Sequence, residues 1–258
     1  MTLMLSPIAH VPATTGRILA VASGKGGVGK TWLAVTLAHA LARAGQRILL
    51  FDGDLGLANV DIQLGIAPPH DIGAVIAGRV TLADAVVACP AGGFDILAGR
   101  SGSGALSALD PVALEGLLAG LRAATGRYDS VLLDLGAGLD RAVRRMSAFA
   151  DSLLVLATEE PTSLTDAYAA LKLFARDRPG GDARVVVNQA TSRAAGERTF
   201  ATLARACRSF LGTAPALAGI IRRDPHVPEA IRRQSLLLMR HPASPAAADI
   251  AALAETLR

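Results

Sequence analysis

One glycine-rich stretch of the chain has the residue types and the spacing of a phosphate-binding loop. Glycines let backbone N–H groups converge on phosphate oxygens. In this pattern the last lysine can reach the β and γ phosphates, and the hydroxyl after it can bind Mg²⁺. The sequence therefore predicts a site for a nucleoside triphosphate and Mg²⁺, with Lys30 on phosphate and Thr31 on the metal. The stretch reads Gly24-Lys25-Gly26-Gly27-Val28-Gly29-Lys30-Thr31.

The residues around this loop supply the strand and the helix that a phosphate loop needs. An apolar run, Ile18 to Ala22, precedes the loop, and Leu33 to Ala44 follows it with the spacing of a helix. The alternative is a glycine-rich turn with incidental lysines, which would not require this order of elements. The strand, loop and helix together favour phosphate binding, with the helix N-terminus behind the phosphates.

Three aspartates follow predicted strands. Asp52 and Asp54 come after the run Arg47 to Phe51, and Asp134 ends the run Ser130 to Asp134. Ligands of parallel sheets lie beyond the carboxyl ends of the strands, so we expect these carboxylates at one edge. One could hold a metal-bound water and another could orient an attacking water, although each could instead cap a helix. The glycines that follow, up to Gly138, suggest a loop that senses the γ phosphate.

Short β-branched runs alternate with helical runs, which is typical of a parallel sheet covered on both faces. The sequence predicts one α/β domain over residues 17–258, with a mostly parallel sheet of seven or eight strands, after a flexible extension over residues 1–16. The strand candidates are Ile18 to Ala22, Arg47 to Phe51, Phe94 to Leu97, Ser130 to Asp134, Leu153 to Ala157, Arg184 to Asn188 and Leu217 to Ile221. The further helix candidates are Val112 to Ala123, Leu139 to Ala150, Ser163 to Arg176, Phe200 to Leu211 and Ala246 to Leu257.

Composition and charge narrow the class of protein. Apolar residues make up 51% of the 258 residues and aromatic residues only 3%, so we expect an aliphatic core. The net charge of +4 permits contact with nucleic acid or anionic lipid without showing either. Met1 to Ala13 lacks the features of a secretory signal, and no stretch is long and apolar enough to span a membrane. We therefore expect a cytoplasmic protein.

Two cysteines and one loop complete the survey of the chain. Cys89 and Cys207 are far apart and lack the spacing of metal ligands, so we interpret them as buried thiols in a reducing compartment. Gly99 to Ser107 is rich in glycine and serine and is predicted to form a mobile surface loop.

Lys25 lies inside the loop, and the sequence around it resembles the deviant Walker A motif of the MinD/ParA ATPases. Two further stretches resemble the FlhG (FleN) branch of that family, whose members control flagellar number and placement. The likeness spans Arg17 to the C-terminus and implies a P-loop NTPase fold and slow, Mg²⁺-dependent hydrolysis of ATP to ADP and phosphate. The two stretches are Asp52-Gly-Asp-Leu-Gly-Leu-Ala-Asn-Val-Asp61 and Glu160-Pro-Thr-Ser-Leu-Thr-Asp-Ala-Tyr168.

The resemblance implies a switch in which ATP joins two copies of the chain face to face. Lys25 would reach the phosphates of the partner subunit, and Asp54 would position the attacking water. A lysine supplied in this way adds positive charge to the transition state only when the dimer exists, which couples hydrolysis to assembly.

The resemblance also implies roles for the remaining site residues. Thr31 and, through water, Asp52 and Asp134 would serve Mg²⁺, Asn188 would read adenine, and Glu160 would lie near the ribose. Asn188 could instead cap a turn after its strand. Glu160 could be a solvated acid that favours the N-terminal dipole of a helix.

Three features depart from the family pattern. Trp32 stands where many relatives have a small polar residue near the α phosphate, so it would either contact nucleotide or pack into the core. Met1 to Gly16 lacks the segment with which relatives stimulate a GTPase of the signal-recognition-particle type. The run Ala246 to Leu257 places Ile250, Leu253 and Leu257 on one face without basic residues along the other, so we expect a packing helix and no strong membrane anchor.

A basic cluster raises a second possibility. Arginines can neutralise DNA phosphates without sequence preference, although a solvated helix face is the alternative. We expect His226 within the cluster to be a loop residue and not a ligand. The arginines are Arg222, Arg223, Arg232 and Arg233, with Arg240 nearby.

Three functional hypotheses follow. The first is an FlhG-like switch that forms a homodimer with ATP, binds a flagellar assembly protein or a GTPase, and is recruited to a cell pole. The second is a ParA-type positioning ATPase on DNA. The third is a nucleotide-binding scaffold without turnover. An iron–sulfur carrier is disfavoured because the two cysteines do not form a paired cluster site.

Overall fold

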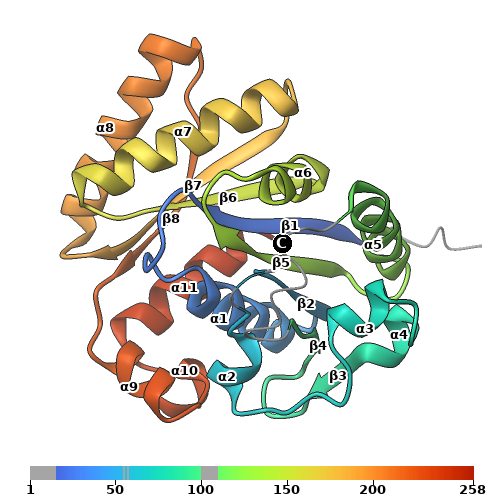
Figure 1. The fold of residues 1–258 in the computed structure, drawn as a ribbon. Coiled ribbons are helices and arrows are strands. Elements are labelled where there is room, and N and C mark those ends of the chain that lie inside the picture. Colours follow the sequence, from blue (N-terminus) through green and yellow to red (C-terminus); the bar gives the residue numbers. More distant parts are fainter. Residues whose placement is uncertain (1–15, 55, 57, 100–109) are drawn as a thin grey trace, which may run out of the picture.

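The computed structural model describes residues 16–54, 56, 58–99 and 110–258. In these residues an eight-stranded sheet has the order β3-β4-β2-β5-β1-β6-β7-β8, and all neighbours are parallel except β3, which runs antiparallel to β4 (Figure 1). The seven predicted strands are confirmed, and β3 is an eighth, short edge strand that the sequence did not reveal. The strands are β1 (Arg17–Ser23), β2 (Ile48–Gly53), β3 (Val86–Cys89), β4 (Phe94–Leu97), β5 (Ser130–Ala137), β6 (Ser152–Ala157), β7 (Asp182–Ala190) and β8 (Ala216–Arg222).

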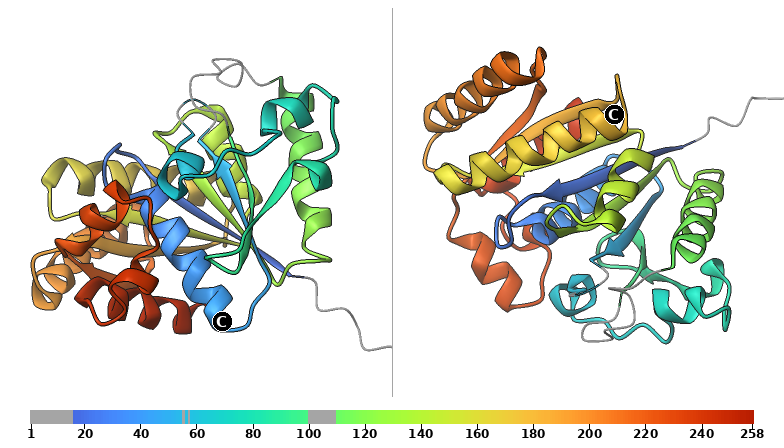
Figure 2. Two further views of the ribbon diagram at one scale, coloured as in Figure 1. Left: turned by 90° about the horizontal axis from the view of Figure 1, so that it is seen from below. Right: turned by 45° about the horizontal axis from the view of Figure 1, so that its top comes forward.

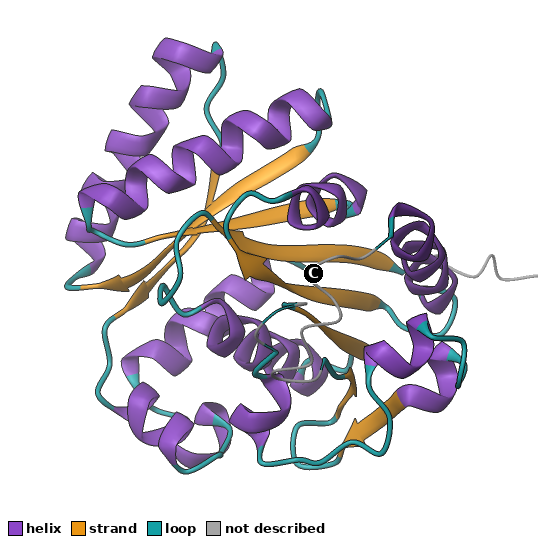
Figure 3. Cartoon of the chain, viewed as in Figure 1, coloured by secondary structure: helices purple, strands orange, loops and turns teal. Residues whose placement is uncertain are grey.

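Helices cover both faces of the sheet (Figures 2 and 3). One apolar core lies between the sheet and α1, α2, α9, α10 and α11, and the other lies under α3 to α8. The helices are α1 (Lys30–Arg43), α2 (Val60–Leu64), α3 (Ile72–Ile76), α4 (Leu82–Ala85), α5 (Pro111–Ala124), α6 (Arg141–Phe149), α7 (Pro161–Asp177), α8 (Arg193–Leu211), α9 (His226–Arg232), α10 (Leu237–Arg240) and α11 (Pro245–Thr256).

The central strand β1 shows why its sequence is apolar without alternation. Leu19 and Val21 belong to the core under α1, whereas Ile18, Ala20 and Ala22 belong to the opposite core. Successive side chains of a strand point to opposite faces, so a strand covered on both faces has no solvent side. The prediction that helices cover both faces of the sheet is therefore confirmed.

Several helix boundaries differ from the sequence prediction. The helix α8 begins at Arg193 and not at Phe200, because the Ser192 hydroxyl caps it by accepting a bond from the Ala195 N–H. The short helices α2, α3, α4, α9 and α10 were not predicted, because four to seven residues are too few to show a helical period. The prediction of a loop at His226 is wrong, since this residue begins α9.

The sequence also made predictions about the two cysteines, the last helix and membrane spans. Cys89 and Cys207 are buried free thiols, as predicted. The helix α11 packs on β8 and α1, and it buries Ile250, Leu253 and Leu257 as expected for a packing helix. None of the helices in the described ranges has the length and apolarity needed to cross a membrane. The extension over residues 1–16, except Gly16, and the predicted loop from Gly99 to Ser107, except Gly99, lie outside the described residues.

A buried aspartate joins three elements on the α1 side of the sheet. Asp224 follows β8, and its Oδ1 accepts a hydrogen bond from the His226 N–H at 2.9 Å and lies 2.8 Å from His226 Nδ1. Its Oδ2 accepts a bond from the Ala246 N–H at 3.0 Å, at the start of α11. Burial alone would raise the pKa of Asp224, but hydrogen bonds from Ala246 and His226 outweigh it and lower the pKa to about 2.

We predict that Asp224→Asn lowers the free energy of unfolding by about 1–2 kcal/mol, because an amide NH₂ group must then face one of these donors. Asp110→Asn is the matched control, since Asp110 uses one oxygen to accept a bond from the Val112 N–H at the start of α5, which an amide oxygen can replace. Urea unfolding of both variants measures the difference. The loss at Asp224 should shrink as the pH falls from about 4 toward 2, because the folded-state pKa lies below the unfolded one. Equal losses in the two variants would contradict the joining role.

Candidate nucleotide-binding site

The predicted phosphate loop connects β1 to α1 at the carboxyl edge of the sheet. Gly29 has a left-handed backbone, with φ of 91°, and a Cβ atom there would lie 2.6 Å from Asn188 Nδ2. A Cβ atom on Gly24 would lie 2.6 Å from the backbone oxygen of Asp166 in α7. Glycine is therefore required at both ends of the loop, where β7 and α7 approach it closely.

Lys25 is held by the start of α7. Its Nζ atom forms an ion pair with Glu160 and donates a hydrogen bond to Thr162 Oγ1 at 3.1 Å. The side chains of Lys25 and Glu160 are 37% and 65% exposed. A hydrogen bond and charge from Lys25, with a smaller contribution from Arg223, lower the pKa of Glu160. The structure thus brings together two predicted site residues, and it adds Thr162, which lies in the Glu160-to-Tyr168 stretch but was not singled out.

Ser23 connects this lysine to the loop after β5. The Ser23 hydroxyl donates to the Lys25 carbonyl at 2.6 Å, and the Ser23 carbonyl accepts from the Gly138 N–H at 3.1 Å. Sequence analysis did not identify Ser23, although it directly precedes the glycine pattern.

The prediction that Asp134 ends its strand is wrong, because β5 continues to Ala137 and the loop begins only at Gly138.

Lys30 and Asp134 are buried together beneath the loop. Lys30 is 8% exposed, and its pKa is lowered by burial against the opposing charges of Asp134 and Asp54. Burial, and then the charge of Asp52, raise the pKa of Asp134 to about 8. The nearby Thr31 hydroxyl and the charge of Lys30 lower this pKa by less. In the described part of the chain neither carboxylate oxygen of Asp134 has a hydrogen bond. A buried carboxylate with unused oxygens beside a threonine hydroxyl is an oxygen donor set that fits Mg²⁺ and its water ligands.

Asp52 and Asp54 differ in their surroundings. Asp52 Oδ2 accepts hydrogen bonds from the N–H groups of Asn59 and Val60, both at 3.0 Å, so it caps α2 while it lies at the site. Burial raises the pKa of Asp52 to about 6. Asp54 Oδ1 accepts from the Gly56 N–H at 3.3 Å and lies 3.3 Å from the position of a Cβ on Gly136, over the end of β5. The predicted convergence of the three carboxylates is therefore observed, and the capping alternative also holds for Asp52.

Asn188 lies at the opposite side of the loop. It is 2% exposed, and its Nδ2 atom donates to the Val28 carbonyl at 2.7 Å. Asn188 lies within β7, so it does not cap a turn after the strand. The next residue, Gln189, has a left-handed backbone with φ of 57°, which is unusual for a residue other than glycine. The amide group is thus fixed against the phosphate loop by the strand.

The remaining predicted residues lie elsewhere. Trp32 is 5% exposed and belongs to the core under α1. The arginine cluster is divided: Arg222 pairs with Asp249, at 2.8 and 2.9 Å, and Arg240 pairs with Glu229 at 3.0 Å. Arg223, Arg232 and Arg233 are exposed. Two of the five arginines therefore have carboxylate partners in the protein.

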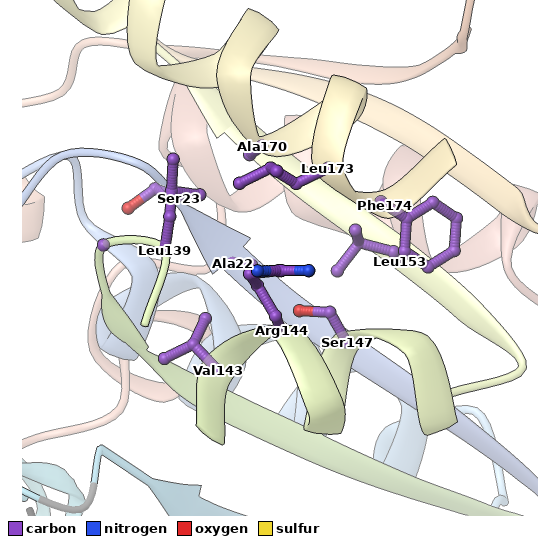
Figure 4. A pocket seen from close by; sticks show the side chains of 11 residues that line it. Ala22, Ser23, Leu139, Val143, Arg144, Ser147, Leu153, Ala170, Leu173 and Phe174 are labelled. Carbon is purple, nitrogen blue, oxygen red and sulfur yellow. The ribbon is translucent and has the colours of Figure 1, made fainter. Parts of the chain in front are cut away.

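A hollow lies beside the site between α6 and α7 (Figure 4). Its lining includes Ser23 and Gly138, which join the lysine to the loop after β5, together with Leu139, Val143 and Phe174. Arg144 also lines the hollow, and its guanidinium group binds Asp177 through two bonds of 2.7 Å. The hollow is mainly aliphatic and contains no carboxylate, so it does not resemble a phosphate or metal site.

Residues 19–237 match the family described as the CobQ/CobB/MinD/ParA nucleotide binding domain. The chain is 38% identical over 239 residues to the antiactivator FleN of Pseudomonas aeruginosa, a match that covers 93% of this chain and 85% of that protein. The resemblance found in the sequence is thereby confirmed.

Solved structures confirm the predicted fold. The cell division ATPase MinD of Pyrococcus furiosus superposes with a TM-score of 0.80 at 25% identity, and the match covers 94% of this chain and 98% of that chain. The septum site-determining protein MinD of Pyrococcus horikoshii, complexed with Mg-ADP, superposes with a TM-score of 0.79 at 24% identity, and the match covers 94% and 96%.

We predict that Asp134→Asn makes the stability of the nucleotide-free protein less dependent on pH. The folded-state pKa of Asp134, about 8, lies above the ordinary value of 3.8, so folding holds the proton. The stability from this group is therefore complete below about pH 4 and is lost as the pH rises toward 8. Thermal unfolding between pH 4 and 8 measures this, and at pH 8 the variant should melt several degrees above wild type. Parallel melting curves for the two proteins would refute the buried carboxylate as the cause.

Proposed function

This chain belongs to the CobQ/CobB/MinD/ParA family of nucleotide-binding domains, and we propose that it is an ATP-dependent dimerisation switch that regulates flagellar number or placement. Its likeness to FleN supports the flagellar role. The MinD structure complexed with Mg-ADP supports an adenine nucleotide and Mg²⁺ as its ligands. In this proposal the output of the switch is a change of protein partners and not a metabolite.

The position of Lys25 is the observation that supports the switch most directly. In the single chain the lysine binds Glu160 and Thr162, on an exposed surface at the carboxyl edge of the sheet. Exposed ion pairs are screened by solvent and contribute little to stability, so Lys25 can leave Glu160 at small cost when a stronger anion is present. The triphosphate of a partner subunit is such an anion. The lysine would then join the two copies across the nucleotide.

The other site residues would divide the remaining chemistry. The loop from Gly24 to Thr31 would bind the phosphates, with Lys30 neutralising the β and γ phosphates. Asp54, at the end of β2 and over Gly136, would orient the water that attacks the γ phosphate. Thr31, Asp52 and Asp134 would hold Mg²⁺ and its waters, and the metal would supply positive charge for phosphate release. Asn188 would hold adenine and Glu160 would lie near the ribose.

Two partner proposals follow from the family. A flagellar assembly protein or a GTPase of the signal-recognition-particle type would recognise the ATP dimer, and the cytoplasmic protein would be recruited to a cell pole. DNA binding is the weaker alternative, because Arg222 and Arg240 already pair with carboxylates. DNA retention that depends on ATP and falls with rising salt would favour that alternative.

Solution mass measurement with ATP, with ADP and without nucleotide tests the switch. We expect a dimer only with ATP and Mg²⁺, most clearly in Asp54→Ala, which should hold the ATP state. A folded protein that ignores ATP, or one that binds ATP and remains monomeric at every concentration, would exclude the proposal.

We predict that Lys25→Ala binds ATP with nearly unchanged affinity but does not dimerise, because the removed charge acts on the nucleotide of the partner subunit. Lys30→Ala is the contrasting variant and should lose ATP binding, since Lys30 is the buried cation of the same loop. Calorimetry measures binding and light scattering measures dimerisation. A normal ATP-dependent dimer of the Lys25 variant would show that the lysine does not act across the interface.

We predict that Asp54→Ala binds ATP normally and slows phosphate release by roughly 10²-fold or more, as expected when a residue that positions the attacking water is lost. Single-turnover phosphate release at high protein concentration measures the rate. Asp61→Ala serves as the control, because it removes another carboxylate of the same stretch, one that accepts a bond from the Ile62 N–H within α2. Turnover at the wild-type rate in the Asp54 variant would move the water-positioning role to another residue.

A further inference from the structure

The end of β7, which carries Asn188, has an irregular backbone. The pairing of β7 with β8 changes register between Val187 and Ala190, and Gln189 within this step has a left-handed backbone with φ of 57°. A residue other than glycine adopts this conformation at a cost, and it persists only where the surrounding contacts fix it. On the β8 side, the Ala190 carbonyl accepts a hydrogen bond from the Arg223 N–H at 2.8 Å. The β6 side needs a corresponding contact.

Glu159 supplies the contact on the β6 side. The ladder between β6 and β7 ends with the pair Ala157 and Val187, so beyond this pair the two chains are joined by side chains. Glu159 Oε1 accepts hydrogen bonds from the Thr191 N–H at 2.7 Å and from the Thr191 hydroxyl at 3.1 Å, and Oε2 lies 3.3 Å from the same hydroxyl. Hydrogen bonds to a charged acceptor are stronger than those between neutral groups. The carboxylate therefore holds the first residue after β7.

Asn188 is fixed at the other end of the same short segment. Its amide donates to the Val28 carbonyl of the phosphate loop at 2.7 Å. The segment from Asn188 to Thr191 is therefore held at one end by the phosphate loop and at the other end by Glu159. Loss of the second contact would free the left-handed turn between them to relax, and the direction of the Asn188 side chain would then be less well defined.

We propose that Glu159 is a positioning residue for the base of the bound nucleotide: its carboxylate holds the turn after β7 so that the Asn188 amide faces adenine. The proposal rests on the nucleotide site of the proposed function and adds a residue that sets its base specificity without touching the ligand. The next residue, Glu160, pairs with Lys25. Two successive carboxylates before α7 thus serve two parts of the site, the base side and the phosphate side.

The ratio of the affinities for Mg-ADP and Mg-GDP measures this role, since the two ligands share the ribose and the phosphates and differ in the base. We expect the wild-type chain to prefer ADP in calorimetry. Glu159→Ala should lower the ratio roughly fivefold, the effect of about one lost hydrogen bond, mainly through weaker ADP binding. Glu159→Gln should retain most of the ratio, because its amide oxygen can accept from the Thr191 N–H and its NH₂ group can donate to the hydroxyl.

Asp182→Ala is the matched control. Asp182 joins the same two strands at their opposite ends, where its Oδ2 accepts from the Ser152 hydroxyl at 2.7 Å. This variant should keep the wild-type ratio. Hydrogen exchange gives a second readout, since the Thr191 N–H should exchange faster in Glu159→Ala than in wild type. Thr191→Val, which removes only the hydroxyl, should lose part of the ratio.

Several results would overturn the proposal. A Glu159→Ala protein with the wild-type ratio would show that the carboxylate has no effect on the base, and equal weakening of ADP and GDP would show a general structural role. An equal fall of the ratio in the Asp182 variant would have the same meaning. If Glu159→Ala does not fold, a wild-type ratio in Thr191→Val decides against the proposal.

Failure of this inference can be distinguished from failure of the proposed function. A wild-type chain that binds ADP and GDP equally would overturn the role of Glu159 alone, and the dimerisation switch would stand. A folded wild-type chain that does not bind ADP would overturn both.

Discussion

The burial of both Lys30 and Asp134 beneath the phosphate loop is the constraint on which the site depends. Removing a cation and an anion from water is costly, and their mutual attraction offsets this cost only in part. Burial accordingly lowers the pKa of Lys30 and raises that of Asp134 to about 8, and among the described residues the Asp134 oxygens have no hydrogen-bond partner. Both groups are held in place because β5 and the start of α1 are anchored in the apolar cores of the sheet. In the proposed function, a polyphosphate would complement the charge of Lys30, and Mg²⁺ would favour the charged form of Asp134.

Two lysines of the same loop have opposite surroundings. Lys30 is buried at the start of α1, whereas Lys25 lies on the exposed surface and pairs with α7. A buried lysine is held in one arrangement by its neighbours, while an exposed ion pair exchanges partners at low cost. The first arrangement suits permanent contact with phosphate, and the second suits a contact that forms only when another subunit arrives. The difference comes from burial and not from residue type.

The short helix α2 connects the site to the turn after α9. Asp52 holds the start of α2, and the Gln234 side chain donates to the Ile62 carbonyl at 2.8 Å near its end. Gln234 has a left-handed backbone with φ of 49°, and Gly65 leaves it room, since a Cβ there would lie 2.9 Å from its Oε1. The helix α2 is therefore tied at one end to the carboxylates of the site and at the other to the turn after α9.

Local sequence patterns determined much of this protein: the phosphate loop between β1 and α1, seven of the strands, and the convergence of Asp52, Asp54 and Asp134. These features follow from glycine spacing, apolar runs and the rule that parallel strands end at one edge. The tertiary structure decided the rest. The edge strand β3 and the short helices have too few residues for a period, and the pairing of Lys25 with Glu160 and Thr162 joins segments far apart in the chain. The division of the arginines, the capping by Asp52 and the unpaired N–H of Trp32 depend on which side chains meet after folding, and burial and partners are not encoded in the spacing of residues along the chain.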